Sequence, residues 1–286
     1  MEFFLNLLRS VAYGIIEGVT EWLPISSTGH MILAEQVLKF SFSAEFMEMF
    51  RVVIQLGAIL AVVVLYFKKL WPFCADNGRD SGFSRHFRWP VVRLWCKIIV
   101  ACVPAAVLGL LLDDWLDAHL YNSITVALML IIYGIAFILI ERRPRVPTTT
   151  KLSRITYKQA IIVGAWQVLA LIPGTSRSGA TIIGGLLCGM SRACASQFTF
   201  FLAIPVMAGA SGLKLVKFLA KGGVFTLGEV GTLLVGCIVA FVVSILAIRF
   251  LMDYVKKHTF TVFGWYRIAL GILVLGIWAL QSFVLA

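Results

Sequence analysis

The first apolar region of the chain, residues 3–40, is interrupted by the stretch Glu17-Gly-Val-Thr-Glu-Trp-Leu-Pro-Ile-Ser-Ser-Thr-Gly-His30. Carboxylates, hydroxyls and an imidazole are concentrated in this short segment. Polar and ionisable groups at membrane depth are costly, and those that occur usually serve a function. Proline, glycine and polar residues in the middle of an apolar run also break a helix. We therefore predict a re-entrant pair of helices that enters a membrane, turns at this stretch and returns.

The composition is that of an integral membrane protein. Of 286 residues, 60% are hydrophobic and only 14% are charged, and the mean hydropathy is +0.94. Soluble domains do not have this composition. The net charge of +11 does not indicate a nucleic-acid partner, because the basic residues are grouped in short stretches between apolar runs. The six cysteines form no CxxC pair, and we expect them to be reduced.

Six further apolar segments have about the length of ~20 residues that a helix needs to cross a bilayer. We predict transmembrane helices at residues 46–66, 94–112, 122–140, 198–218, 229–253 and 263–285. A second broken apolar region, residues 157–192, contains Pro173-Gly-Thr-Ser-Arg-Ser-Gly-Ala-Thr181. We predict that this region forms a second re-entrant pair, so the fold class is an all-α integral membrane protein.

The two broken regions resemble each other. Gly14-Ile-Ile-Glu17 matches Gly164-Ala-Trp-Gln167, and the run from Leu23 to Gly29 matches the run from Ile172 to Gly179 with a shift of one residue. Three predicted spans follow each region, and an odd number of spans per repeat inverts the second copy. We therefore expect one membrane domain, residues 1–286, with an inverted-topology repeat: copy one at about 1–143 and copy two at about 155–286. Such repeats place a site near the midplane, where they meet.

Charge predicts the orientation. Most basic residues lie in three stretches: Lys68, Lys69, Arg79, Arg85, Arg88, Arg93 and Lys97; Arg142, Arg143, Arg145, Lys151, Arg154 and Lys158; and Arg249, Lys256 and Lys257. The opposing loops carry few: 113–123 has Asp113, Asp114 and Asp117, and 214–229 has Lys214, Lys217 and Lys221. The basic side is cytoplasmic by the positive-inside rule, so both termini lie outside. The first re-entrant pair then enters from the outer face and the second from the cytoplasmic face, and their tips can meet.

Glu17 and Glu21 are candidate metal ligands. Residues four apart share one face of a helix, where two like charges repel unless a cation, a shared proton or an arginine offsets them. Carboxylate and diphosphate oxygens suit Mg²⁺ or Ca²⁺. The alternative is a polar stripe that merely faces water.

Three hydroxyl residues, Ser26, Ser27 and Thr28, follow Pro24 at an expected helix start. They can act as helix caps, and a helix N-terminus also binds anions. A nucleophilic hydroxyl needs an adjacent base, and His30 lies only two to four residues further on. The alternative for His30 is an inert buried imidazole.

Arg177 supplies the positive charge that the first motif lacks. Its planar fork suits phosphate oxygens, and an unpaired arginine is expensive in lipid. Neighbouring groups add hydrogen-bond donors or allow close backbone approach: Gly174, Ser176, Ser178 and Thr181. The alternative is an internal Arg177–Glu21 salt bridge without a ligand. Weaker candidates are Gln167 as a supporting residue, Gln55 as a helix–helix contact, and Arg51 as a neutralising or snorkelling cation.

The chain resembles the undecaprenyl-diphosphate phosphatase, or bacitracin-resistance, family over essentially its whole length. The resemblance rests on two motifs: ExxxE followed by LPxSSTGH, and PGxSRSxxT. The resemblance implies hydrolysis of the C55 isoprenyl diphosphate to undecaprenyl phosphate and inorganic phosphate, which recycles the lipid carrier for peptidoglycan synthesis. It also implies a divalent cation and a site in the bacterial inner membrane, open to the periplasmic side.

The same resemblance implies roles for the motif residues. Glu17 and Glu21 bind the cation or transfer protons, Ser27 or Thr28 is the nucleophile, and His30 is its base or the acid for the leaving group. The diphosphate is bound by Arg177 foremost, together with Ser26, Gly174, Ser176, Ser178 and Thr181.

The runner-up function is a transporter or flippase of a prenyl-phosphate lipid, because inverted repeats with broken helices are a transporter architecture. A purely structural membrane subunit gives no role to the polar midplane. The attacking group, the cation, tail-length selectivity and a possible homodimer stay open in the sequence.

Overall fold

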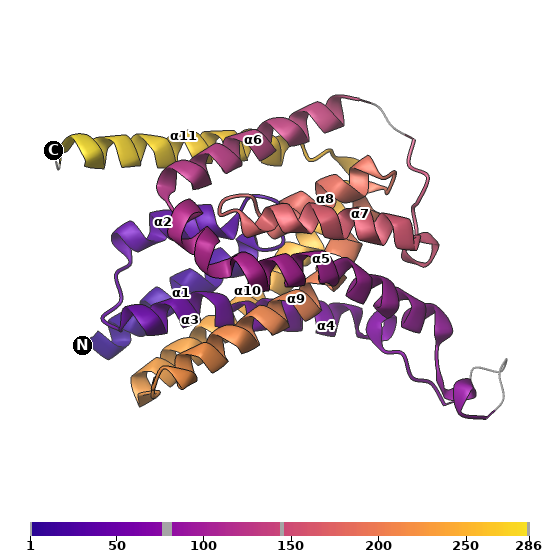
Figure 1. Cartoon of the computed structure of the whole chain (residues 1–286), viewed down its shortest axis with the longest axis horizontal. Helices are drawn as coiled ribbons and strands as arrows, with labels where there is room; N and C mark the ends of the chain where they lie inside the picture. Colours follow the sequence, from indigo (N-terminus) through magenta and orange to yellow (C-terminus); the bar gives the residue numbers. More distant parts are fainter. Residues whose placement is uncertain (1, 76–81, 144–145, 285–286) are drawn as a thin grey trace.

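The computed structural model describes residues 2–75, 82–143 and 146–284. Helices make up nearly all of this part (Figure 1). They are α1 (Glu2–Thr20), α2 (Ser27–Val37), α3 (Ala44–Val53), α4 (Gln55–Leu70), α5 (Trp89–Leu120), α6 (Ser123–Arg142), α7 (Tyr157–Val168), α8 (Arg177–Leu187), α9 (Arg192–Ala220), α10 (Leu227–Lys257) and α11 (Thr261–Val284).

Six helical segments within the described residues are long and apolar enough to cross a membrane, as the sequence predicts. They are Ala44–Leu70, Trp89–Leu112, Ser123–Arg142, Arg192–Ala220, Leu227–Lys257 and Thr261–Ser282. The first is broken: α3 ends at Val53 and α4 begins at Gln55. Gln55 therefore lies at a helix junction rather than inside a continuous helix. The protein is an all-helical, multi-pass membrane protein, and its six cysteines are free.

Local sequence signals fix where several helices begin. The Asn122 side chain accepts a hydrogen bond from the Thr125 N–H at 2.9 Å, which caps α6. Thr226 and Glu229 form a capping box at the start of α10. These caps satisfy backbone N–H groups that a helix leaves without intrahelical partners.

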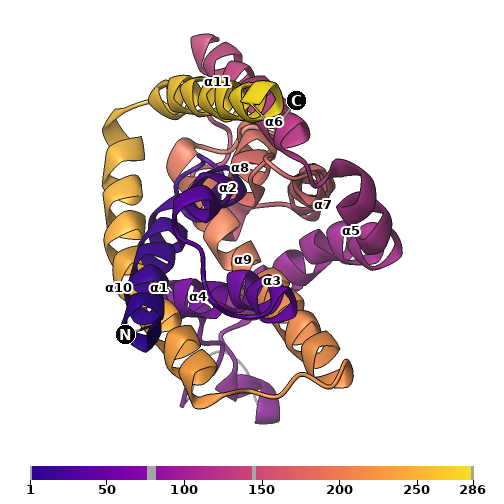
Figure 2. The same cartoon turned by 90° about the vertical axis from the view of Figure 1, so that its left-hand side faces the viewer.

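The helices pair through close approaches at glycine. Figures 1 and 2 show α6 and α11 side by side, apart from the central helices, and a Cβ on Gly134 would lie 2.7 Å from the Gly264 carbonyl oxygen. A Cβ on Gly14 of α1 would lie 2.8 Å from the Gly236 oxygen of α10. On α7, a Cβ on Gly164 would lie 2.4 Å from the Ala101 oxygen of α5. Only glycine permits these backbone contacts.

The two termini lie at the same end of the molecule in Figure 1, on the left. The segments that join α4 to α5 and α6 to α7 lie at the opposite end and carry many of the basic residues. The predicted loops at 113–123 and 214–229 are wrong in part, because α5 continues to Leu120 and α9 continues to Ala220. Arg79 and Arg145 lie outside the described residues.

Two turns at the centre position the site. Residues 21–26 join α1 to α2, and residues 169–176 join α7 to α8 through a short 3₁₀ turn. The turn ahead of α2 is anchored in the main apolar core by Trp22, which is fully buried and contacts Phe200 edge to face with ring centroids 5.2 Å apart. Whether each pair of helices is re-entrant, and whether the two halves form an inverted repeat, stay predictions, as do the repeat boundaries.

Candidate active site

Both polar motifs line one pocket of about 180 Å³. Its polar lining comes from four helices or the turns beside them: Glu21, Ser27, Thr28, Gln55, Ser176 and Arg177. The other walls are apolar, from Ala170 to Pro173 and from α9 residues after Pro205. Residues about 150 positions apart in the chain therefore share a single cavity.

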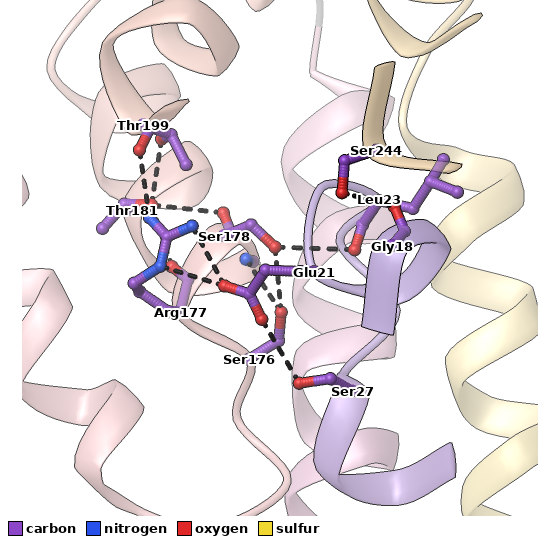
Figure 3. A network of polar contacts seen from close by, with 11 residues as sticks. Gly18, Glu21, Leu23, Ser27, Ser176, Arg177, Ser178, Thr181, Thr199 and Ser244 are labelled. Atoms are coloured by element: carbon purple, nitrogen blue, oxygen red, sulfur yellow. Dashed lines mark hydrogen bonds and ion pairs between the residues drawn. The ribbon is translucent and has the colours of Figure 1, made fainter. Parts of the chain in front are cut away.

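Arg177 and Glu21 form the central contact of this pocket (Figure 3). The Arg177 Nε and Nη2 atoms donate to Glu21 Oε1 at 3.2 and 3.1 Å, and Nη1 donates to the Thr199 carbonyl oxygen at 3.0 Å. The side chains are only 11% and 8% exposed. Arg177 is therefore not an unpaired charge, and its contact with phosphate stays a prediction. The pair also has the geometry of the alternative internal salt bridge, although Arg177 still lines the pocket.

Ser27 contacts the other oxygen of the same carboxylate. Its hydroxyl donates to Glu21 Oε2 at 3.3 Å, as Figure 3 shows. Glu21 is thus placed between a guanidinium and a hydroxyl, one on each oxygen. A carboxylate beside a serine hydroxyl can accept its proton.

Glu17 lies one helical turn before Glu21. The Glu21 N–H donates to the Glu17 carbonyl oxygen at 3.0 Å, so both carboxylates lie on one helix face. They are 1% and 7% exposed, which makes the alternative of a water-facing polar stripe wrong. Glu17 Oε1 has no hydrogen-bond partner among the described residues. Buried polar atoms are normally paired, so this oxygen has room for a partner such as a cation, although Glu17 does not line the pocket.

The described residues gather no group of three or more His, Cys, Asp or Glu side chains. The protein therefore offers two carboxylates rather than a complete metal cage. Mg²⁺ is often bound by one or two carboxylates together with substrate phosphate oxygens and water. The donor set fits such a cation.

Two helix N-termini face the pocket. α2 begins at Ser27 and α8 begins at Arg177, and the preceding residues, Ser26 and Ser176, are the two non-glycine residues with positive φ in the described chain, at 75° and 67°. The Ser176 hydroxyl caps α8 through the Gly179 N–H at 3.2 Å, whereas Ser26 makes no side-chain cap. Helix N-termini attract anions through unpaired N–H groups and the helix dipole.

Ser178 and Thr181 support the site from behind. They are 1% and 0% exposed, and neither lines the pocket. Ser178 Oγ lies 3.1 Å from Ser176 Oγ, and Thr181 Oγ1 donates to the Arg177 carbonyl oxygen at 2.8 Å. Thr199 Oγ1 in turn donates to Thr181 Oγ1 at 2.9 Å, which links α8 to α9. Their contacts position Arg177 and Ser176 rather than face a ligand.

Gly174 shapes the turn ahead of α8. Its φ is +88°, and a Cβ there would lie 2.5 Å from the Val126 carbonyl oxygen. No other residue fits this conformation and this close approach to α6.

His30 does not contact the hydroxyl of Ser27 or Thr28. Its Nδ1 lies 2.7 Å from the Ser26 carbonyl oxygen, and its Nε2 lies 2.8 Å from the Tyr266 hydroxyl. A carbonyl oxygen only accepts, so Nδ1 carries the hydrogen and Nε2 accepts from the tyrosine. The Tyr266 ring also stacks on the imidazole with centroids 5.6 Å apart. Both nitrogens of His30 are occupied, and its role as a base stays a prediction.

The three weaker candidates from the sequence lie in different places relative to the pocket. Gln55 lines the pocket. Gln167 is buried, and neither of its amide atoms has a partner among the described residues. Arg51 forms an ion pair with Glu35 instead of a site carboxylate.

Sequence reasoning missed three residues around the site: Thr199, Tyr266 and Arg267. Arg267 carried a usable signal, since it is the only charged residue in the apolar segment 263–285. Ionisable residues inside such segments are functional candidates by default. The other two carry no such signal, because single hydroxyls are common in apolar helices.

The chain is similar to known proteins over nearly its whole length. Residues 10–273 match the family described as bacitracin resistance protein BacA. The undecaprenyl-diphosphatase of Enterococcus faecalis is 60% identical over 277 residues, covering 96% of this chain and 98% of the relative. The undecaprenyl-diphosphatase of Streptococcus gordonii is 56% identical over 283 residues, covering 98% of each. The one from Desulfitobacterium hafniense is 57% identical over 276 residues, covering 94% of this chain and 95% of the relative. The chain therefore belongs to the bacitracin resistance protein BacA family.

Proposed function

We propose that this protein hydrolyses undecaprenyl diphosphate to undecaprenyl phosphate and inorganic phosphate, which recycles the lipid carrier for peptidoglycan synthesis. The observation that carries the proposal is the pocket in which Glu21 and Ser27 face Ser176 and Arg177. Full-length relatives that are 54–60% identical have the name undecaprenyl-diphosphatase, and this supports the substrate.

The diphosphate binds between the two helix N-termini. The Arg177 fork contacts phosphate oxygens, and the first N–H groups of α2 and α8 surround the same position. A phosphate that binds Arg177 competes with Glu21 for the guanidinium. Glu21 is then released to accept a proton.

Ser27 is the favoured nucleophile, because its hydroxyl already contacts Glu21. Its oxygen attacks the terminal phosphorus, its proton passes to Glu21, and the bond from that phosphorus to the bridging oxygen breaks. The lipid leaves as the monophosphate. Water then hydrolyses the phosphoserine and releases inorganic phosphate. The alternatives are that water attacks the phosphorus directly or that the Thr28 hydroxyl is the nucleophile.

Glu17 and Glu21 are the residues that would hold a divalent cation, Mg²⁺ or Ca²⁺. The unpartnered, buried Glu17 Oε1 supports this assignment. When bound, such a cation neutralises charge on the phosphoryl oxygens.

We also propose a place and an orientation for the protein. It lies in the bacterial inner membrane with its basic end in the cytoplasm, and its pocket opens to the periplasmic side. The shared end of both termini, opposite the basic segments, is consistent with this orientation.

Lipid transport is the competing function, and one observation favours it. The proposed repeat mates behave alike: Gly14 and Gly164 allow α1 and α7 to touch α10 and α5, and Ser26 and Ser176 share positive φ. Such pseudo-symmetry is typical of transporters. A transporter, however, has no need of a serine beside a carboxylate.

Phosphate release from a C15 or C55 prenyl diphosphate by the purified protein tests the proposal. We expect release that EDTA abolishes and a divalent cation restores. A pure transporter does nothing in detergent, since it has no second compartment. No release with any divalent cation would therefore reject the phosphatase and favour transport.

A further inference from the structure

Arg267 of α11 lies fully buried between the two turns that precede α2 and α8. Its Nη2 atom donates to the carbonyl oxygens of Gly174 and Thr175, each at 2.9 Å. Its Nη1 atom donates to the carbonyl oxygen of Pro24 at 3.3 Å. One guanidinium thus joins the backbone of the first motif to the backbone of the second.

Arg267 has no carboxylate partner among the described residues. Apart from the carbonyl oxygens, which include that of Met129 at 3.5 Å, it faces the ring of Tyr133, with 5.5 Å between the guanidinium carbon and the ring centroid. A buried charge is stable only when hydrogen bonds or counter-charges compensate it. Here the carbonyl groups of the two turns provide that compensation, so the turns and the arginine stabilise one another.

The bonded carbonyl of Thr175 stands directly before Ser176, and that of Pro24 stands two residues before Ser26. In a planar trans peptide the C=O and the following N–H point in opposite directions. The Thr175 carbonyl points toward Arg267, and the Ser176 N–H therefore points away from it. Ser26 and Ser176 have φ values of 75° and 67°, which residues other than glycine keep only where the surroundings fix them. Arg267 contacts both turns through the backbone carbonyl oxygens of Pro24, Gly174 and Thr175.

We propose that Arg267 is a positioning residue that holds the two turns together, so that Ser27 and Glu21 face Arg177 across one pocket. Arg267 is fully buried and does not line the pocket. The effect of Arg267 on catalysis rests on the proposed phosphatase function. Its contact with the two turns does not depend on that function.

The first measurement compares Arg267→Lys with wild type in phosphate release from a prenyl diphosphate. Lysine keeps the charge but lacks the planar fork that reaches two turns at once. We expect kcat to fall about 100-fold, the size of a lost transition-state contact, while KM changes less than about threefold. The matched control is Arg192→Lys, which alters the Arg192–Glu141 pair outside the pocket and should leave kcat unchanged.

The second measurement does not need activity. Hydrogen–deuterium exchange should become faster in peptides covering residues 22–28 and 172–178 together, while exchange elsewhere and the melting temperature in detergent change little. Arg192→Lys should change exchange near Glu141 but not in the two turns. Arg267→Gln, which keeps an amide donor without the charge, serves as a second variant.

The outcomes are distinct. If wild type releases no phosphate, the proposed function fails, and exchange in the two turns still decides the role of Arg267. Unchanged exchange in both turns, or an unchanged kcat in an active protein, would overturn the positioning role. Loss of the folded protein in both variants would overturn it as well, because Arg267 would then serve overall stability.

Discussion

Glu21 accepts two hydrogen bonds from Arg177, which lies 156 residues later in the chain. The carboxylate directly follows α1 and the guanidinium begins α8, so the contact joins the two halves of the sequence at the pocket. The second carboxylate oxygen of Glu21 accepts from Ser27. A substrate that binds Arg177 through phosphate must therefore change the environment of the group that contacts the serine.

Ser27→Ala tests the nucleophile. We expect kcat to fall at least about 100-fold with the fold retained, because the hydroxyl beside Glu21 is removed. Acid quenching of wild type with ³²P-labelled diphosphate should trap label on a peptide that contains Ser27. Ser43→Ala removes the α3 cap, a hydroxyl bonded to the Phe46 N–H at 3.1 Å, and should cost about 1 kcal/mol of stability without loss of rate. Trapped label in Ser27→Ala would instead assign the attack to Thr28.

Arg177→Lys tests the phosphate fork. Lysine cannot reproduce the simultaneous contacts with Glu21 and the Thr199 carbonyl oxygen, so we expect kcat/KM to fall about 10²- to 10³-fold. Inhibition by inorganic phosphate should weaken in parallel. Arg51→Lys is the control, because the Arg51–Glu35 pair lies outside the pocket. Full activity of Arg177→Lys would leave only the internal salt bridge as the role of Arg177.

Glu17→Gln tests the cation site. The amide keeps the shape of the side chain but removes a charged ligand, and we expect the cation concentration for half-maximal rate to rise about 10- to 100-fold. The measurement is a Mg²⁺ or Ca²⁺ titration of protein that has been stripped with EDTA. Glu48→Gln changes only the Glu48–Lys214 ion pair and should titrate like wild type. An identical titration for Glu17→Gln would remove Glu17 from the cation site.

His30→Asn and His30→Gln separate a structural role from proton transfer. The asparagine amide reproduces the Nδ1 donor toward the Ser26 carbonyl oxygen, and the glutamine amide reproduces Nε2. If His30 positions Ser26, His30→Asn keeps at least about a tenth of the rate, and His30→Gln loses about 100-fold, the range of a lost acid–base group. Equal inactivity of both variants would favour a base or acid role. Tyr266→Phe, which removes only the donor to Nε2, should change the rate less than about fivefold.

Gly164→Ala tests the close contact of α7 with α5. The added methyl group would lie 2.4 Å from the Ala101 carbonyl oxygen, and overpacking of this kind costs about 1–3 kcal/mol. We expect a lower melting temperature in detergent and a lower rate, since α7 leads into the turn ahead of Arg177. Gly212→Ala meets nothing within 4 Å and should leave the protein as stable as wild type or more so. Equal melting temperatures for the two variants would contradict the close contact.

The sequence predicted the helices because hydropathy and helix-breaking residues act over short stretches of chain. Apolar length predicted all six spans, and the polar stretches around Pro24 and Pro173 marked where the helices break. The predicted loops at 113–123 and 214–229 were wrong in part, since charged residues such as Lys217 continue a helix without interrupting its hydrogen bonds. The break at Ile54 was missed, because no proline or glycine marks it.

The sequence by itself determined that this is a helical membrane protein with two polar motifs suited to phosphate chemistry, because residue type and spacing fix hydropathy, helix breaks and ligand chemistry. Only the tertiary structure decided which groups meet. It placed Arg177 on Glu21, turned His30 toward Tyr266, and put Arg267 between the two turns. These contacts join residues more than 90 positions apart, and their geometry depends on how the helices pack rather than on any local pattern.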